Sequence, residues 1–256
     1  MNSHNSGMLK TKSKDKIFAD KKDKMSDFNF GKETAGVFDD MLERSVPFYK
    51  ELQRMMCEIA VDFAADGTNI YDLGCSTGIT LFNIYEAVKK DVKYIGIDSS
   101  QDMLDRCRAR FSGNNSTNQY SLICTDLNNG VNITNASVVV MNLTLQFVRP
   151  LHREQLIKNI CNGLNTNGCL ILLEKVLGNN SDFNRMFIKY YYEMKKRNGY
   201  TELEIAQKRE ALENILIPYR LDENKDLLKK SGFAHCDTFF KWYNFCGLVA
   251  LKSSFR

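Results

Sequence analysis

The chain has 256 residues, 43% hydrophobic and 11% aromatic, which is enough to bury the core of one α/β domain with an insertion. Its eight cysteines contain no C-x-x-C pair and its three histidines are dispersed, so we predict reduced thiols and no metal site. We find no signal-peptide pattern and no apolar run near the roughly 18 residues of a membrane span. We therefore expect a cytoplasmic protein without a membrane partner.

The net charge of +4 is carried by the first 25 residues, which hold seven lysines and three aspartates. We predict that residues 1–25 form a disordered lysine-rich tail, with an RNA-binding arm as the alternative. Residues 26–256 hold 28 basic and 28 acidic side chains and make up the single predicted domain. Because a face that binds nucleic acid usually carries a basic excess, this balance argues against stable nucleic-acid binding by the domain.

Two amphipathic helices are predicted between residues 28 and 67, ahead of the first strand. Apolar residues recur at spacings of three and four on both sides of a break at Ser45-Val46-Pro47, where the proline suits the first turn of the second helix. Because these helices precede the first strand, we expect them to lie where a lid could cover a ligand.

A strand, a glycine-bracketed turn and a helix are predicted over residues 69–84. The turn is Gly74-Cys75-Ser76-Thr77-Gly78. Glycine at position 74 lets a ligand approach the backbone closely, and the start of the following helix offers unpaired N–H groups. A turn of this kind, at the carboxyl end of a strand in an open α/β sheet, is typical of a site for a nucleotide-like cofactor.

Polar residues occur at or just after the ends of four successive predicted strands, which are 69–73, 93–98, 120–124 and 138–141. These residues are Gly74, Cys75 and Ser76, then Asp98 and Ser99, then Asp126 and Leu127, and finally Asn142. A fifth apolar strand follows at 169–173. Apolar strands that alternate with helices indicate a parallel sheet, so the carboxyl ends of these strands should meet at one edge.

After the fifth strand the alternation stops. Residues 178–218 are predicted to form an inserted helix pair, and 221–231 a further helix; runs at 238–243 and 245–251 are spaced to pair as an antiparallel hairpin. This order resembles the class I S-adenosylmethionine-dependent methyltransferase (Rossmann-like) fold. That fold is a seven-stranded, mostly parallel sheet with a C-terminal antiparallel hairpin. Residues 72–78 resemble its first motif, Asp/Glu-x-Gly-x-Gly-x-Gly, with Ser76 in place of the second glycine.

The strand-end residues suit a cofactor with an amino acid, a ribose and an adenine. The backbone at 74–76 would meet the amino-acid part, Asp98 would accept from the ribose diol, and Asp126 from the adenine amino group. Asn142 would hold the amino-acid end or the sulfonium side. The alternative for any one of these acids is a helix cap or a turn former.

No general base can be assigned from the sequence. No histidine falls at a strand end, and neither Asp/Asn-Pro-Pro-Tyr nor a Pro-Cys nucleophile follows the fourth strand. On the insertion, Arg209 could pair with a carboxylate through a bidentate contact. From spacing alone, however, Lys208 and Arg209 are predicted to belong to a solvated helix face with nearby glutamates.

Several segments more closely resemble the carboxy-S-adenosyl-L-methionine synthase family, in register from about residue 26 to 252. The most specific are Asn-Leu-Thr-Leu-Gln-Phe at 142–147 and Glu-Leu-Glu-Ile-Ala-Gln-Lys-Arg at 202–209. The resemblance implies an enzyme that converts S-adenosyl-L-methionine and prephenate to carboxy-S-adenosyl-L-methionine and phenylpyruvate. Carbon dioxide lost by prephenate is captured at the sulfonium methyl carbon. The product supplies the carboxymethyl group for modification of the tRNA wobble uridine (cmo5U).

The resemblance also assigns residues. It implies that Arg209 pairs with the new carboxylate, that Tyr200 assists there, and that Tyr49, Ser99 and Leu127 join the cofactor-binding set. We expect a homodimer, with Arg209 acting in its own subunit or in the partner, and no stable direct tRNA binding. The alternatives are an S-adenosylmethionine-dependent tRNA methyltransferase and a regulatory protein that binds the cofactor without catalysis.

Overall fold

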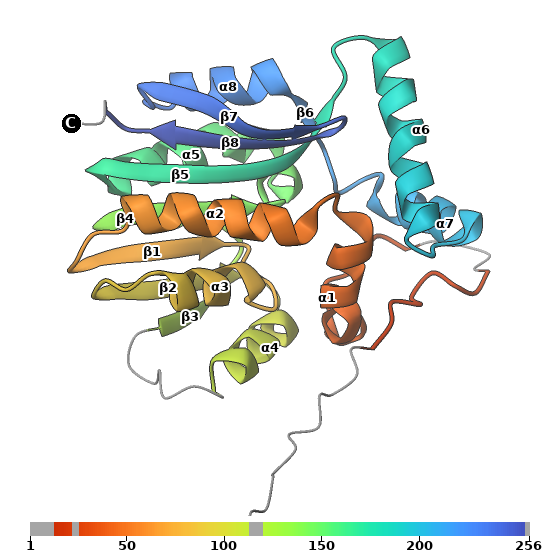
Figure 1. Cartoon of the computed structure of the whole chain (residues 1–256), viewed down its shortest axis with the longest axis horizontal. Coiled ribbons are helices and arrows are strands. Elements are labelled where there is room, and N and C mark those ends of the chain that lie inside the picture. Colours follow the sequence, from red (N-terminus) through yellow and green to blue (C-terminus); the bar gives the residue numbers. More distant parts are fainter. Residues whose placement is uncertain (1–12, 22–25, 113–119, 254–256) are drawn as a thin grey trace, which may run out of the picture.

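The computed structural model describes residues 13–21, 26–112 and 120–253, which form a central β-sheet between two layers of helices (Figure 1). The sheet order is β3-β2-β1-β4-β5-β8-β7, with β6 paired to β5 off this path. This confirms the predicted class I methyltransferase architecture. The strands are β1 (Thr68–Leu73), β2 (Val92–Asp98), β3 (Tyr120–Cys124), β4 (Ala136–Asn142), β5 (Leu164–Leu177), β6 (Tyr219–Arg220), β7 (His235–Trp242) and β8 (Phe245–Leu251).

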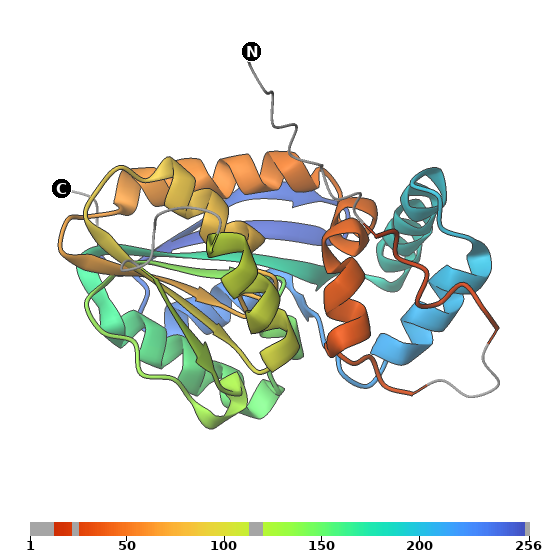
Figure 2. The same ribbon diagram turned by 90° about the horizontal axis from the view of Figure 1, so that it is seen from below.

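Helices cover both faces of the sheet, as the view from below makes clear (Figure 2). One face carries α2 (Tyr49–Phe63), α3 (Ile79–Ala87) and α4 (Gln101–Phe111), and the other carries α5 (Pro150–Gly163) and α8 (Leu221–Lys230). Beyond the carboxyl ends of the parallel strands stand α1 (Lys32–Ser45), α6 (Ser181–Arg197) and α7 (Glu202–Leu212). Within the described part of the chain, no helix combines the length and the apolar character needed to cross a membrane.

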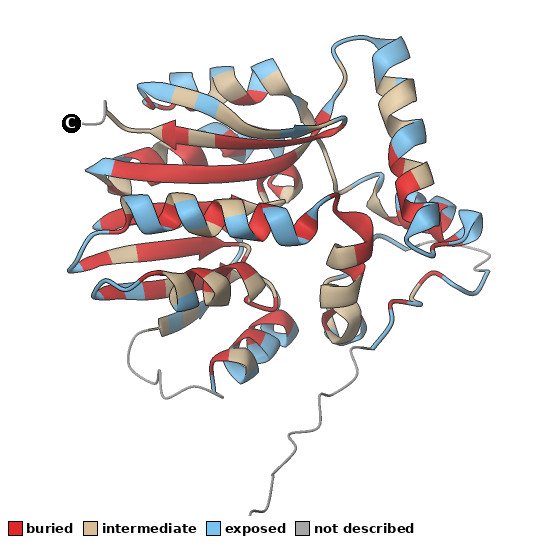
Figure 3. Ribbon diagram, in the orientation of Figure 1, coloured by how far each residue is buried: buried red, intermediate tan, exposed pale blue. Residues whose placement is uncertain are grey.

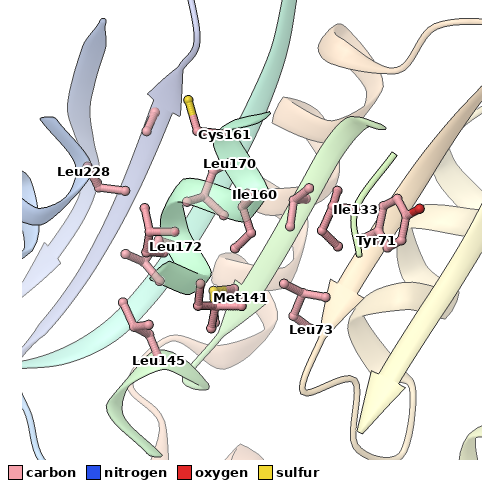
Figure 4. Packing of buried hydrophobic residues seen from close by; sticks show 14 of the residues in the cluster. Tyr71, Leu73, Ile133, Met141, Leu145, Ile160, Cys161, Leu170, Leu172 and Leu228 are labelled. Carbon is pink, nitrogen blue, oxygen red and sulfur yellow. The ribbon is translucent and has the colours of Figure 1, made fainter. Parts of the chain in front are cut away.

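The central strands are buried along most of their length, which accounts for their apolar runs (Figure 3). Tyr71 and Leu73 of β1, Met141 of β4 and Leu172 of β5 belong to one cluster of buried side chains (Figure 4). The parallel register pairs β1 with both β2 and β4, and β4 with β5. Packing of this cluster therefore fixes the sheet edge at which the predicted polar residues meet.

Strand β8 runs antiparallel between β5 and β7, as the predicted terminal hairpin requires. Strand β5 is longer than the apolar run 169–173 that predicted it. Its pairing with β8 continues to Glu174↔Cys246 and Lys175↔Phe245. Because the partner strand satisfies the backbone of these two polar residues, they stay in the sheet, and Lys175 is carried to the ligand-facing edge.

Residues 13–21 pack against the domain, which differs from the disordered tail predicted for residues 1–25. Phe18 and Asp15 are buried. The Gln207 side chain on α7 donates to the carbonyl oxygens of Phe18 and Asp20, both at 2.9 Å. Satisfied backbone groups and one buried aromatic ring thus hold this segment despite its polar composition. Residues 1–12 and 22–25 lie outside the described residues.

Candidate functional site

A cavity of about 390 Å³ lies at the carboxyl ends of the parallel strands, within the range typical of small-molecule sites. Its walls come from the strand-end loops, from α1 and the start of α2, and from α7. The predicted cofactor residues that line it are Tyr49, Gly74, Cys75, Ser76, Asp98, Ser99, Asp126, Leu127 and Asn142. The sheet therefore brings together the strand-end residues that the sequence placed there.

The turn after β1 needs glycine at position 74, because its backbone is left-handed there and the Thr144 side chain fills the adjacent space. Gly74 has φ +76°, and a Cβ at this position would lie 2.4 Å from Oγ1 of Thr144. Its N–H groups are already used, because Gly74 and Cys75 both donate to the carbonyl oxygen of Ile97 and Ser76 donates to Asp98. Glycine at position 74 therefore allows Thr144 to approach the turn closely, and the amides of residues 74–76 serve the fold.

Four buried polar atoms at the cavity have no hydrogen-bond partner among the described residues. They are both carboxylate oxygens of Asp72, the hydroxyl of Tyr49 and Oδ1 of Asn142. Burial, with a contribution from the charge of Asp98, raises the pKa of Asp72 to about 7. Buried polar atoms without partners are rare and costly, so this set fits a ligand with cationic or hydrogen-bond-donating groups, such as an ammonium.

Sequence reasoning assigned no role to Asp72. The available signal was an acid two residues before Gly74 in an otherwise apolar strand. The neighbouring Asn142 was assigned, and the structure adds how it is oriented: its amide donates to Oγ1 of Thr80 at 3.0 Å, and Gln53 donates to the same oxygen at 3.1 Å. The free Oδ1 is thereby fixed toward the cavity.

The carboxylate of Asp98 is held in one orientation. Its two oxygens accept from the backbone N–H groups of Ser76 and Ser100, both at 2.9 Å. Burial raises its pKa, and these backbone donors act in the opposite direction. The Oδ1 of Asp126 accepts from the Asn128 backbone amide and so caps a short 3-10 helix, and the residue also lines the cavity; its contact with an adenine amino group stays a prediction.

Helix α1 and the segment before it close the cavity from outside, in the position expected for a lid. The ring of Phe30 meets that of Phe147 edge-on at 5.3 Å between centroids, and both line the cavity. The Ser100 hydroxyl donates to the Phe30 carbonyl oxygen at 2.7 Å. Apolar rings fastened to the loop after β2 exclude water from the ligand and strengthen the electrostatic contacts inside.

Comparison with known proteins gives the family. A family described as "Methyltransferase domain" matches residues 70–168. The carboxy-S-adenosyl-L-methionine synthase of Methylococcus capsulatus is 58% identical over 241 residues, covering 94% of this chain and 100% of that protein. The chain belongs to the carboxy-S-adenosyl-L-methionine synthase family. The synthase of Desulfotalea psychrophila is 42% identical over 227 residues, covering 88% of this chain and 92% of that protein. The predicted family and enzyme class are thus confirmed.

Solved structures support the fold at much lower identity. A putative S-adenosyl-L-methionine-dependent methyltransferase from Methanococcus maripaludis aligns with TM-score 0.59 and 14% identity, covering 91% of this chain and 98% of that one. Human N-acetylserotonin methyltransferase, solved in complex with SAM, aligns with TM-score 0.58 and 13% identity, covering 87% and 56%. At these identities the alignments speak for the fold alone.

Within one chain, the two residues assigned to the carboxylate of the synthase product lie away from the cavity. Arg209 is exposed on a surface hollow between α6 and α7, whereas Lys208, one position earlier, is buried and lines the cavity. Successive helix positions are about 100° apart, so the two side chains leave α7 in different directions. Tyr200 is buried, and its hydroxyl donates to Oδ2 of Asp15 at 2.6 Å.

The solvated helix face predicted for α7 is therefore wrong at Lys208 and holds for Arg209. The helix packs its Glu204, Gln207 and Lys208 side chains inward against residues 13–21 and α1. Sequence reasoning also gave no site role to Lys175. Only Lys208 was predicted to lie on a solvated face, and packing beside Asp15, which is far away in the sequence, buries it.

Proposed function

We propose that the chain converts S-adenosyl-L-methionine and prephenate to carboxy-S-adenosyl-L-methionine and phenylpyruvate. The observation that carries the first half of this proposal is the set of unpartnered buried oxygens on Asp72, Tyr49 and Asn142. These would accept hydrogen bonds from the ammonium of the cofactor's amino-acid end. Asp98, held by two backbone donors, would take the ribose diol, and Asp126 would take the adenine amino group.

The proposed reaction balances without a protein base. In prephenate, the bond to the departing carboxylate breaks, its electron pair completes the aromatic ring, and the ring hydroxyl leaves as hydroxide. The hydroxide takes a proton from the sulfonium methyl group and becomes water. The carbon dioxide then forms a new carbon–carbon bond at that methyl carbon. Atoms and charge balance, and the protein's part is to orient the two substrates and exclude water.

We propose further that the enzyme acts as a homodimer in the cytoplasm and that Arg209 reaches the cavity of the partner subunit, where it pairs with the new carboxylate. Its exposed position on α7 is compatible with this arrangement. The product would serve as the carboxymethyl donor for the tRNA wobble uridine (cmo5U), with tRNA bound by a later enzyme. The charge balance of residues 26–256 supports the last point.

Mass spectrometry tests the proposal directly. The purified protein is incubated with S-adenosyl-L-methionine and unmodified tRNA, with and without prephenate. We expect a cofactor product heavier by one carboxylate group and an equal amount of phenylpyruvate, both only when prephenate is present. Formation of S-adenosylhomocysteine together with methylated tRNA would instead support the methyltransferase alternative. Binding of the cofactor with neither outcome would support a regulatory role.

A further inference from the structure

The charge of the polar residues at the cavity changes from negative to positive along the sheet edge. Strand order places Asp126, Asp98 and Asp72 at the ends of β3, β2 and β1, Asn142 at the end of β4, and Lys175 near the end of β5. At about 4.8 Å between neighbouring strands, β5 lies roughly 10 Å from β1 and 14 Å from β2. The end of the cavity with the three aspartates suits the cationic sulfonium ligand. Lys175, at the other end, would instead lie beside an anionic group.

Lys175 lines the cavity, and its ammonium forms neither a hydrogen bond nor an ion pair with the residues that the structure describes, whereas its backbone N–H donates to Oε1 of Gln146 at 3.2 Å. Its Nζ lies 4.5 Å from the centroid of the Tyr191 ring and 5.7 Å from that of Phe245. Burial, with the nearby charge of Lys195, lowers its pKa to about 7. The Lys175 residue is half-buried, and an ammonium partly shielded from water without a counter-charge is costly, so the position is suited to an anion.

A second cavity-lining lysine comes from α7. Lys208 Nζ donates to the Ser45 hydroxyl at 3.4 Å and lies 4.0 Å from Oδ2 of Asp15. Burial lowers its pKa to about 7, and the charges of Lys195 and Lys175 contribute in the same direction. The two lysines therefore act on each other across the cavity wall, although they stand on different elements.

The acids near these lysines do not balance them. Asp15 already accepts from Tyr200, and its backbone oxygen accepts from Arg44 at 3.1 Å. Glu204 raises the pKa of Lys195, but its carboxylate is used in the capping box at the start of α7. Arg44 is paired with Asp40 at 3.3 Å, so Asp15 and Glu204 are the two carboxylates left against the three lysines Lys175, Lys195 and Lys208, which leaves a positive excess at this part of the cavity.

We infer that Lys175 and Lys208 form the binding site for a carboxylate of the anionic second substrate, beside the sulfonium end of the cofactor site. The inference deepens the proposed function and rests on it for the identity of the second substrate, a dicarboxylate. The bound carboxylate would supply the counter-charge that the folded chain lacks. It would also hold the second substrate on the β5 side, next to the acidic part that binds the cofactor.

Kinetics with matched lysine variants test the inference. We expect Lys175→Met and Lys208→Met each to raise KM for prephenate about ten- to a hundredfold, the loss of one charge-assisted contact, with the Kd of S-adenosyl-L-methionine within about twofold. Lys175→Arg should recover part of the loss. The control is Lys229→Met, an exposed lysine on α8, which should change neither value. An unchanged KM for prephenate in both cavity variants would overturn the inference.

A binding measurement separates this inference from the proposed function. Calorimetry with prephenate and with phenylpyruvate should show proton uptake on binding near pH 8. With pKa values of about 7, the two lysines are mostly neutral at pH 8, and a bound anion favours their protonated forms. Lys175→Met should therefore reduce the number of protons taken up. If prephenate binds in this lysine-dependent way but is not turned over, the proposed reaction fails and the anion site stands. If prephenate is turned over and lysine substitution changes neither binding nor proton uptake, the anion site fails and the reaction stands.

Discussion

At the scale of single residues, Asp72 is the most informative group in the cavity. It lies within β1 with 1% of its surface exposed, and neither carboxylate oxygen has a hydrogen bond of good geometry among the described residues, although the backbone N–H of Leu81 lowers its pKa. A buried carboxylate without a partner favours its protonated form, which is why its pKa rises to about 7. A bound ammonium would reverse this preference, so we predict that Asp72 couples cofactor binding to pH.

We predict that affinity for S-adenosyl-L-methionine increases as pH rises from 6 to 8. Below pH 7 the free enzyme holds a proton on Asp72 that must leave before the carboxylate can pair with an ammonium. Asp72→Asn should weaken binding about ten- to a hundredfold at pH 8 and remove most of this pH dependence. Isothermal calorimetry at several pH values measures both effects. A variant that keeps the wild-type slope would exclude Asp72 as the linked group.

At the scale of elements, α1 is fastened over the cavity by one polar cluster. Asp39 on α1 accepts from the Thr77 hydroxyl at 2.7 Å and from Arg110 at 2.6 Å, and Arg110 also donates to the Thr77 carbonyl oxygen at 3.0 Å. Thr77 belongs to the turn after β1 and Arg110 to α4. The cluster therefore ties the lid helix to the turn at the cavity wall.

We predict that Asp39→Asn loosens α1 without unfolding the domain. Loss of the charge-assisted contact should lower the free energy of unfolding by about 1–2 kcal/mol and weaken cofactor binding several-fold. Hydrogen exchange should accelerate in α1 more than in the central strands. The matched control is Asp182→Asn, which removes an exposed ion pair with Arg185 on α6 and should have little effect. Equal exchange rates in α1 of the wild type and Asp39→Asn would refute the fastening role.

At the scale of the whole molecule, one chain supplies the cavity but keeps Arg209 on the outer surface of α7. Aromatic side chains are exposed on the neighbouring α6 and on the hairpin turn, among them Phe183 and Tyr243. Exposed aromatic groups of this kind are enriched at protein interfaces. Together these features motivate the proposal that a second copy of the chain delivers Arg209 to the cavity.

Mixed dimers test this proposal. Arg209→Ala and Asp98→Ala should each abolish formation of the carboxylated product. If Arg209 acts in the partner subunit, a mixed dimer contains one site with an intact cavity and an intact arginine. Random exchange of the two variants should then restore about a quarter of the wild-type activity, measured by mass spectrometry. If mixing restores nothing while light scattering shows dimers, Arg209 does not act across the interface.

The central strands could be predicted from the sequence because they are buried on both faces of the sheet. Strands covered on both faces carry continuous apolar runs, so 93–98 and 138–141 could be located from the sequence. The parallel order then brought Asp98, Asp126 and Asn142 to one edge. The apolar run at 169–173 predicted only the centre of β5, because the pairing that extends the strand to Lys175 depends on β8, more than 60 residues later.

The sequence by itself determined the fold class, the family and the row of strand-end residues at the cavity, because local periodicity and short motifs encode which strands end where. Only the tertiary structure decided that the β5 side of the cavity carries positive charge, from Lys175 and Lys208. In the sequence Lys208 resembles a surface lysine, but in the fold Asp15 packs beside it. The pKa of Asp72 rises only because its neighbours exclude water. Desolvation depends on contacts between distant segments, and no local pattern records it.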